Sequence, residues 1–295
     1  MHLAILASPD SWYLADLRRA AAARHEVTAL AFRDLQSEIA VQAGGNAVQV
    51  SAGGRDLRRI DALLVRTMPP GSLEQVVFRM DLLGRLEAAG VPVFNPPRAI
   101  EAAVDKYLAS ARLTAAGLPV PRTIVCQTAD DAMNAFAALG GDVVVKPLFG
   151  SEGRGIARLQ DEAMAQRAFR MIAGLGGVLY VQQFIPHGGF DVRVLVVGRK
   201  MFAMRRSNPT DWRTNISRGA TAELIEITAE MADLSRRAAD ALGAPIAGVD
   251  LLQSRDGRMY VLEVNAVPGW KALAAALRVD IAAAVWEYVE RQIDR

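Results

Sequence analysis

The chain has 295 residues, of which 52% are hydrophobic and 22% charged, and this excludes the polar composition of a disordered protein. Its 34 basic and 32 acidic residues are interspersed and leave a net charge of +2, so no nucleic-acid partner is expected. One cysteine excludes an intramolecular disulfide, and without a signal peptide or an apolar run of about 18 to 20 residues we expect a cytoplasmic protein with no membrane partner.

Strand-like and helix-like segments alternate in the first third of the chain, which is the order of an α/β fold. Helices are predicted at Trp12–Arg24 and around Leu73–Ala89. They would connect the strands of a small parallel sheet, namely HLAILA, VTALAF, DALLVRT and VPVFN. The consecutive prolines after Asn95 end the last strand and stiffen the link, so we predict a first domain at residues 1–96.

The rest of the chain has the pattern of an α+β fold. A helix is predicted from about Ala99 to Ala116, with Gly117 at its C′ position. A second helix near Asp130–Leu139 lies between the strands RTIVC and DVVVKPL. The segments YVQQFI, DVRVLVVG and KMFAMRR then resemble antiparallel strands, and a helix at Ala229–Leu242 precedes a final hairpin.

The final hairpin, GVDLLQSRDGRMYVLEVNAVPG, carries acidic residues inside two apolar strands. Asp256-Gly257 is typical of a two-residue turn, and counting back from it places Asp250 directly opposite Glu263. Asn265 would share the face of Glu263, about 6 to 7 Å along the strand. Opposed carboxylates repel each other, so the pattern favours a cation between them.

Oxygen ligands without histidine or cysteine favour Mg²⁺ or Mn²⁺. The alternative is a sheet edge whose acids are solvated and prevent aggregation. Nucleophilic catalysis is not indicated, because His2, His25 and His187 have no motif partners and Cys126 lies in an apolar strand.

The segment VVVKPLFGSEGRG, residues 143–155, ends a buried-looking strand at Lys146 and continues into a glycine-rich loop. Glycines let backbone N–H groups approach phosphate oxygens, and a lysine at the strand end can bind a phosphate. The segment lacks the GK[ST] ending of a Walker loop. It also lacks the acidic residue that a dinucleotide fingerprint has about 20 positions further on, at the end of the next strand. By itself the segment indicates either a phosphate-binding loop or a plain turn, and Lys106 by itself would be only a solvated side chain.

The order of these features along the chain is more specific than any one of them. Asp105-Lys106 precedes Lys146 and its glycine loop, and then come VQQFI, Asp191 with Arg193, DWRTNISRG and the acidic hairpin. This series resembles the ATP-grasp carboxylate–amine ligases, and in particular the RimK-like α-L-glutamate ligases, over nearly the whole chain. The resemblance implies an ATP-grasp fold with a Rossmann-like pre-ATP-grasp domain at 1–96, a small central domain at 97–185 and a C-terminal domain at 186–295.

The resemblance also implies ATP and Mg²⁺ (or Mn²⁺) as ligands, and it assigns residues to them. Lys106 and Lys146 would contact the phosphates, residues 181–185 would be the hinge that binds the adenine, and Asp191 would hold the ribose. The full nucleotide set is Lys106, Lys146, Gly150, Ser151, Gly153, Gly155, Gln182, Gln183, Phe184, Ile185, Asp191 and Arg206. The catalytic set is Arg193, Arg213 and Asn215, with Arg218 nearby, and the metal ligands are Asp250, Glu263 and Asn265.

The activity implied by the resemblance is amide-bond formation between an acceptor carboxylate and an amino acid, with L-glutamate expected. ATP converts the carboxylate into an acylphosphate, which the amine then attacks. Because no basic patch for a ribosome-associated partner is present, the expected acceptor is a small coenzyme such as a tetrahydromethanopterin-type carrier. Separately, a homo-oligomer is expected.

Two departures leave alternatives open. The hinge reads Gln182-Gln183-Phe184 where the family commonly has Gln-Glu-Tyr, and Pro209 and Trp212 enter the acceptor-side loop. Trp212 either stacks on a ring-bearing substrate or packs under the loop. The alternative acceptors are a peptide or protein C-terminus and an amino-sugar or carrier-protein carboxylate. From other classes, a catalytically silent ATP-binding regulator remains, whereas ILASPDSW lacks the glycine turn of an NAD-dependent oxidoreductase.

Overall fold

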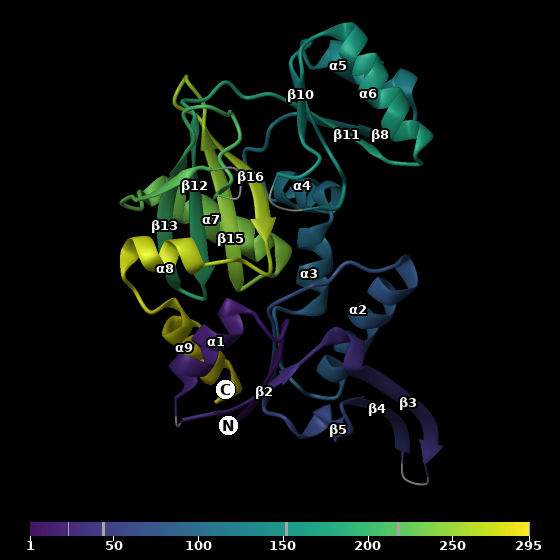
Figure 1. Cartoon of the computed structure of the whole chain (residues 1–295), viewed down its shortest axis with the longest axis vertical. Helices are drawn as coiled ribbons and strands as arrows, with labels where there is room; N and C mark the ends of the chain where they lie inside the picture. The colour runs from purple at the N-terminus through teal and green to yellow at the C-terminus, as the bar shows by residue number, and fades with distance from the viewer. Residues whose placement is uncertain (23, 43–44, 151–152, 217–218, 295) are drawn as a thin grey trace.

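The computed structural model describes residues 1–22, 24–42, 45–150, 153–216 and 219–294 (Figure 1). Its N-terminal sheet is parallel in the order β2-β1-β6-β7, which confirms the predicted α/β arrangement of this part. The strands are β1 (His2–Leu6), β2 (Glu26–Leu30), β6 (Ala62–Val65) and β7 (Val93–Phe94). Ser151 and Arg218, both predicted for the site, lie outside the described residues.

Helices cover both faces of this sheet because successive side chains point to opposite sides. Leu6 and Leu63 pack into the same cluster as α2 (Leu73–Ala88), whereas Ile5 and Leu64 pack with α1 (Trp12–Ala21) and α9 (Ile281–Ile293). A small antiparallel sheet that the sequence did not predict lies between β2 and β6 in the chain. Its strands are β3 (Leu35–Gln42), β4 (Gly45–Ala52) and β5 (Arg55–Asp56), and the short 3-10 helices η1 (Phe32–Asp34) and η2 (Leu57–Arg59) flank them in the chain.

A break at Asp105 divides the single helix predicted at Ala99–Ala116 into α3 (Pro97–Val104) and α4 (Lys106–Ala115). The single-helix prediction is wrong because Asp105 has an extended backbone, with φ −89° and ψ 104°. Its carboxylate accepts a hydrogen bond of 3.0 Å from the backbone N–H of Leu108 and so caps the second helix. Lys106 is therefore the first residue of α4, at the positive end of its helix dipole.

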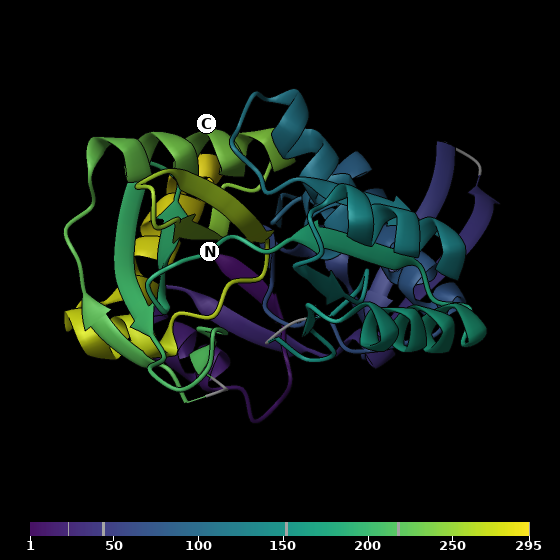
Figure 2. The same ribbon diagram turned by 90° about the horizontal axis from the view of Figure 1, so that it is seen from above.

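The middle sheet has the order β10-β9-β11-β8 and lies at one side of the molecule in both views (Figures 1 and 2). Leu179 and Val181 of β11 face the cluster formed with α5 and α6, so Tyr180 and Gln182 face the opposite side. The elements are β8 (Thr123–Cys126), α5 (Ala129–Ala138), β9 (Val143–Lys146), β10 (Ala157–Leu159), α6 (Glu162–Gly174) and β11 (Leu179–Gln183). Of these, β10 and α6 were not predicted from the sequence.

The C-terminal sheet is antiparallel in the order β14-β13-β12-β15-β16. α7 (Ala229–Leu242) packs on one face, and α8 (Lys271–Leu277) and α9 pack on the other. α9 also contacts α1, where Trp286 Nε1 donates a hydrogen bond of 2.8 Å to the Leu17 carbonyl oxygen. The strands are β12 (Phe190–Val197), β13 (Lys200–Ser207), β14 (Thr221–Leu224), β15 (Ile246–Gln253) and β16 (Met259–Asn265). Within the described ranges, every helix is too short or too polar to span a membrane.

The hairpin of β15 and β16 has the predicted pairing of Asp250 with Glu263, but its turn and its register differ from the prediction. The two-residue turn is wrong: the Ser254 N–H donates to the Arg258 carbonyl oxygen (2.9 Å), so the loop has three residues, with Gly257 at φ 89°. A β-bulge at Leu262 then shifts the register, because Leu251 pairs with Val261 but Asp250 pairs with Glu263. The two irregularities compensate, and the prediction that Asp250 faces Glu263 is confirmed.

Asn95 joins the end of the N-terminal sheet to the C-terminal hairpin. The residue is 2% exposed, and its Nδ2 donates to the carbonyl oxygens of Ile246 (2.6 Å) and Ala266. Its Oδ1 accepts from the Ile246 N–H at 3.0 Å. One amide thus pairs with three backbone groups: the N–H and the carbonyl of Ile246, where β15 begins, and the carbonyl of Ala266, directly after β16.

Asn95→Ala is therefore expected to lower the free energy of unfolding by about 2 to 4 kcal/mol, because truncation leaves buried peptide groups without partners. Urea unfolding measures the change, and Asn134→Ala on the exposed face of α5 is the matched control, with an expected change within about 0.5 kcal/mol. A loss below about 1 kcal/mol for Asn95→Ala would contradict the role of the buried amide.

Candidate active site

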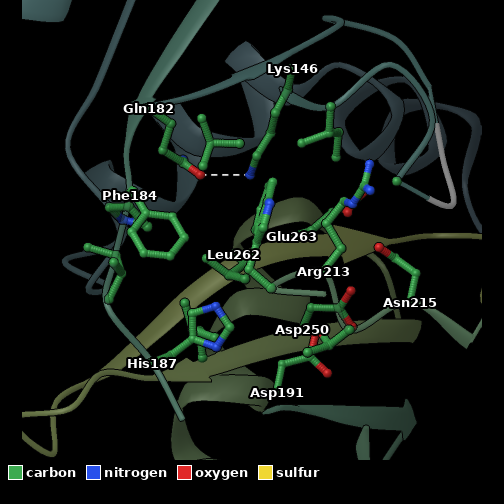
Figure 3. A pocket seen from close by; sticks show the side chains of 18 of the residues that line it. Lys146, Gln182, Phe184, His187, Asp191, Arg213, Asn215, Asp250, Leu262 and Glu263 are labelled. Carbon is green, nitrogen blue, oxygen red and sulfur yellow. Dashed lines mark hydrogen bonds between the residues drawn. The ribbon is translucent and has the colours of Figure 1, made fainter. Parts of the chain in front are cut away.

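A cleft that is open to solvent lies between the middle sheet and the C-terminal sheet (Figure 3). Its lining includes most of the predicted residues: Lys106, Lys146, Gly150, Gly153, Gln182, Gln183, Phe184, Ile185, Asp191, Arg206, Arg213, Asn215, Asp250 and Glu263. Three other predicted residues lie close to this lining. Gly155 lies in the same loop as Gly153, and Arg193 contacts Asp250. Asn265 lies two residues after Glu263 on β16 and pairs with Gly248 of β15.

The two predicted phosphate-binding lysines come from different elements but line the same cleft. Lys146 ends β9, and its Nζ donates a hydrogen bond of 2.7 Å to Gln182 Oε1. Lys106 begins α4, and its Nζ donates to the Gly150 carbonyl oxygen at 2.8 Å. The β9–β10 loop thus starts beside two ammonium groups.

The glycine loop closely approaches the segment after β13. Gly153 has φ +70°, and a Cβ atom built on it would lie 2.5 Å from Asn215 Oδ1. A side chain at this position would therefore clash with Asn215 as well as strain the backbone. The sequence prediction treated this loop and Asn215 as separate parts, and the fold brings Gly153 and Asn215 together at the cleft.

The electrostatic environment of Lys146 suits an anionic ligand. Burial lowers the pKa of Lys146 to about 8, with attraction from Glu263 and Asp250 opposing and repulsion from Lys106 adding to this effect. A bound phosphate would favour the charged ammonium and raise the pKa again. Ligand binding and protonation of Lys146 are therefore coupled.

The affinity for ATP is expected to fall as the pH rises above about 8, because Lys146 is charged below its pKa and neutral above it. Since the complex must take up a proton there, the loss approaches about tenfold per pH unit. Titration calorimetry between about pH 7 and 9.5 measures it, and Lys146→Arg, which stays protonated, should flatten the profile. An ATP affinity that is constant over this range in the wild type would contradict the assignment.

Arginines compensate Asp250, one of the two opposed carboxylates, whereas the hairpin alone indicated a cation between the two acids. Asp250 is 4% exposed and forms ion pairs with Arg193 and Arg206. Nη2 of Arg193 donates a hydrogen bond of 2.9 Å to Asp250 Oδ2, and Nη2 of Arg206 lies 3.0 Å from the same oxygen. Both arginines come from neighbouring strands of the sheet, β12 and β13, so only the tertiary pairing reveals them.

Asp191 belongs to the same buried cluster. Nε and Nη2 of Arg206 donate to its two carboxylate oxygens at 2.7 and 2.6 Å, and Thr214 Oγ1 donates to Oδ2 at 2.6 Å. Burial raises the pKa of Asp191, and the attraction to Arg206 opposes this effect. The carboxylate predicted to hold the ribose thus already orients Arg206 and the segment that carries Thr214.

The acidic end of the cleft fits Mg²⁺. Asp250 and Glu263 offer oxygen ligands from adjacent strands, and alternation along β16 places Asn265 on the face of Glu263. The described part of the chain contains no cluster of three or more His, Cys, Asp or Glu side chains that could hold a metal by itself. A site with two carboxylates leaves positions for water and substrate phosphates, which is the usual mode of Mg²⁺ binding.

The predicted hinge has one backbone donor without a partner among the described residues. The N–H groups of Gln183 and Phe184 donate to the carbonyl oxygens of Arg122 (2.8 Å) and Asp142 (3.0 Å). The N–H of Ile185 has no acceptor in the described ranges, and Ile185 lines the cleft. A ligand that pairs with the hinge backbone would therefore find its donor at Ile185.

Sequence reasoning missed several residues of the hinge end of the cleft, which is the part lined by Phe184, Ile185 and His187. His187 was dismissed because it has no motif partner, yet it lines the cleft, and burial and then Arg158 and Arg255 lower its pKa. Its position three residues after Phe184 was the available signal. The other lining residues that were missed include Arg154, Thr214, Leu252 and Leu262.

Trp212, left open between two roles, lies at this hinge end. Its ring packs edge-to-face on Phe184, with centroids 5.8 Å apart and an interplanar angle of 84°. The Arg158 guanidinium carbon lies 3.5 Å from the centroid of the Phe184 ring. Trp212 therefore packs in an aromatic cluster while it also lines the cleft.

Comparisons with known proteins agree with this geometry. The profile of the RimK-like ATP-grasp domain matches residues 103–289. The tetrahydromethanopterin:alpha-L-glutamate ligase of Methanosarcina acetivorans is 32% identical over 268 residues, which cover 81% of this chain and 82% of that protein. A protein of Azotobacter vinelandii named "Probable alpha-L-glutamate ligase" is 32% identical over 250 residues, covering 83% of this chain and 81% of that protein.

Solved structures share the fold. The ATP-grasp ligase PsnB complexed with a minimal precursor has a TM-score of 0.77 at 25% identity and covers 98% of both chains. A structure of PsnB that also contains Mg and ADP has a TM-score of 0.76 at 24% identity, covering 99% of this chain and 97% of that one. The predicted ATP-grasp fold is confirmed, and ATP-grasp ligases use ATP together with Mg²⁺. Because the family profile spans most of the chain and the relatives match over most of their length, this chain belongs to the RimK-like ATP-grasp family and is an ATP-dependent carboxylate–amine ligase.

Proposed function

We propose that this ligase joins L-glutamate to the carboxylate of a small coenzyme-type acceptor, such as a tetrahydromethanopterin-type carrier. The observation that carries the ligase chemistry is a single cleft that unites Lys146, Asp250 and Glu263 with the guanidinium of Arg213. The choice of acceptor is supported by the similarity to the tetrahydromethanopterin:alpha-L-glutamate ligase along most of both chains.

The residues have complementary proposed roles toward the nucleotide. Lys106, Lys146 and the glycine loop with Gly150, Gly153 and Gly155 hold the phosphates, and the hinge backbone holds the base. Asp250, Glu263 and Asn265 hold Mg²⁺ (or Mn²⁺), which supplies charge neutralisation at the phosphate oxygens. Asp191 orients Arg206 so that its positive charge stays beside the metal ligand Asp250.

The reaction then needs charge stabilisation rather than an enzyme nucleophile. An oxygen of the acceptor carboxylate attacks the γ-phosphorus of ATP, and the bond to the ADP oxygen breaks with its electron pair. The amine of glutamate attacks the acyl carbon of the acylphosphate, phosphate leaves with the electron pair of the broken bond, and the amine proton passes to solvent. Arg193, Arg213 and Asn215 would stabilise the negative oxygens, and the closed loop would exclude water.

A peptide acceptor is the second candidate. It is supported by PsnB, the structural neighbour that was solved with a minimal precursor. A silent regulator is disfavoured, because the lysines and the acidic pair are all retained and line one cleft.

Two measurements test the proposal. Mg-ATP should raise the melting temperature, since a ligand that binds only the native state at a hundredfold excess over its Kd adds about 2.7 kcal/mol of stability. ADP release is then screened with candidate acceptors, among them a pterin coenzyme and peptides with free C-termini, crossed with amino acids, and the products are identified by mass spectrometry. Release that depends on glutamate and a pterin carboxylate supports the proposal, whereas peptide glutamylation alone replaces it with the second candidate. The homo-oligomer stays a prediction, which light scattering tests by measuring the mass of the protein in solution.

A further inference from the structure

A buried amide holds the ammonium group of Lys146. Oε1 of Gln182 accepts from Lys146 Nζ at 2.7 Å, and its Nε2 donates to Thr123 Oγ1 (3.0 Å) and Tyr180 Oη (3.2 Å). Gln182 is 4% exposed. Because an ammonium group can only donate, Oε1 must face Lys146, and the two hydroxyl acceptors fix the opposite end of the amide. Figure 3 shows the contact of Gln182 with Lys146 at the edge of the cleft.

Tyr180 extends this network to the helix that carries the second lysine. Tyr180 is 1% exposed, and its hydroxyl lies 2.7 Å from Ser110 Oγ in α4. Burial raises the pKa of Tyr180, so its hydroxyl stays protonated; it accepts from Gln182 Nε2 and shares a hydrogen bond with the Ser110 hydroxyl. Since α4 begins at Lys106, one buried chain of hydrogen bonds connects the elements that position both lysines.

The chemistry of an amide suits this place better than a carboxylate or an apolar side chain. Lys106 and Lys146 repel each other, and Lys146 also loses hydration in the cleft. A carboxylate at position 182 would hold Lys146 but cancel its charge toward an anionic ligand. An apolar side chain would leave the ammonium free to turn away. A neutral carbonyl oxygen holds the ammonium and leaves its charge available.

We propose that Gln182, oriented by Tyr180 and Thr123, is the positioning residue that holds the Lys146 ammonium toward the nucleotide phosphates without neutralising it. The side chain of Gln182 thus acts in addition to the hinge backbone. This inference rests on the proposed placement of the phosphates at Lys146, and it does not depend on the identity of the acceptor.

A double-mutant cycle tests the inference by direct binding of Mg-ATP. Gln182→Met is expected to raise the Kd on the order of tenfold and Lys146→Met by about a hundredfold. If Gln182 acts through Lys146, the double variant should bind within about twofold of Lys146→Met alone, because the interaction is already lost. Gln127→Met, at an exposed glutamine after β8, is the control and should bind like the wild type.

A merely structural role of Gln182 predicts the opposite pattern. The two single effects would then multiply in the double variant, and this result, like an unchanged Kd in Gln182→Met, would overturn the inference. Gln182→Glu keeps the acceptor oxygen but adds a negative charge, so it should also weaken Mg-ATP binding. Tyr180→Phe keeps the buried ring and removes the hydroxyl, and it replaces Gln182→Met in the cycle if that variant does not fold. Because binding is measured without turnover, a wrong acceptor assignment leaves the result readable.

Discussion

Glu263→Gln is expected to reduce ADP release by about a hundredfold to a thousandfold and to remove most of the Mg²⁺-dependent part of ATP affinity. The change removes one of two opposed carboxylates that line the cleft on adjacent strands, and with it the negative charge that attracts the Lys146 ammonium. Titration calorimetry with and without Mg²⁺, together with an ADP-release assay, measures both effects.

The metal-free stability of the same variant separates a ligand role from a structural role. The charge of Asp250 is already compensated by Arg193 and Arg206, so the variant should unfold within about 0.5 kcal/mol of the wild type. A loss of several kcal/mol would indicate a buried structural pair instead. Glu223→Gln, at an exposed carboxylate on β14, is the control for a strand glutamate and should leave activity unchanged. Ordinary turnover in Glu263→Gln would end the proposal of a metal site here.

Arg206→Met should lower the free energy of unfolding by about 3 to 5 kcal/mol and abolish turnover. The guanidinium is buried, and it is paired with both Asp191 and Asp250, which are themselves 3% and 4% exposed. Without the guanidinium, Asp191 loses both hydrogen bonds from Arg206 and keeps the one from the Thr214 hydroxyl. The two buried carboxylates also lose the counter-ion that they share. Chemical denaturation, with circular dichroism as the readout, measures the loss.

The neighbouring residue on the same strand supplies the control. The Arg205 guanidinium carbon lies 3.9 Å from the centroid of the Phe190 ring, and the side chain points to the opposite face of β13. Arg205→Met should therefore cost no more than about 1 kcal/mol. Arg206→Lys keeps the charge without the two-pronged geometry, and an intermediate loss is expected. Equal losses for Arg205→Met and Arg206→Met would contradict the role of the buried cluster.

Much of the fold follows from local patterns in the sequence. The parallel N-terminal sheet, the boundaries of α7 and the antiparallel C-terminal strands are set by hydrophobic periodicity, which needs no knowledge of distant residues. The break at Asp105 escaped prediction, although an aspartate three residues before Leu108 is a capping signal. The sheet of β3, β4 and β5, with β10 and α6, also went unpredicted.

The candidate site divides in the same way. Asp250 and Glu263 were placed opposite each other from one hairpin, because a hairpin brings near neighbours in sequence into register. The pairing survived a wrong turn length, since the bulge at Leu262 restored the register. Such compensation depends on packing against neighbouring strands, and no local pattern indicates it.

Only the tertiary structure decided which charges meet. Arg193 and Arg206 reach Asp250 because β12 lies between β15 and β13 in the sheet order. Gln182 reaches Lys146 because β11 pairs with β9. Alternation along a strand determines which face a side chain takes, but strand order determines what it finds there. The sequence by itself therefore determined the parallel N-terminal sheet, α7 and the acidic hairpin, whereas the partners of each buried charge were decided by long-range strand pairing.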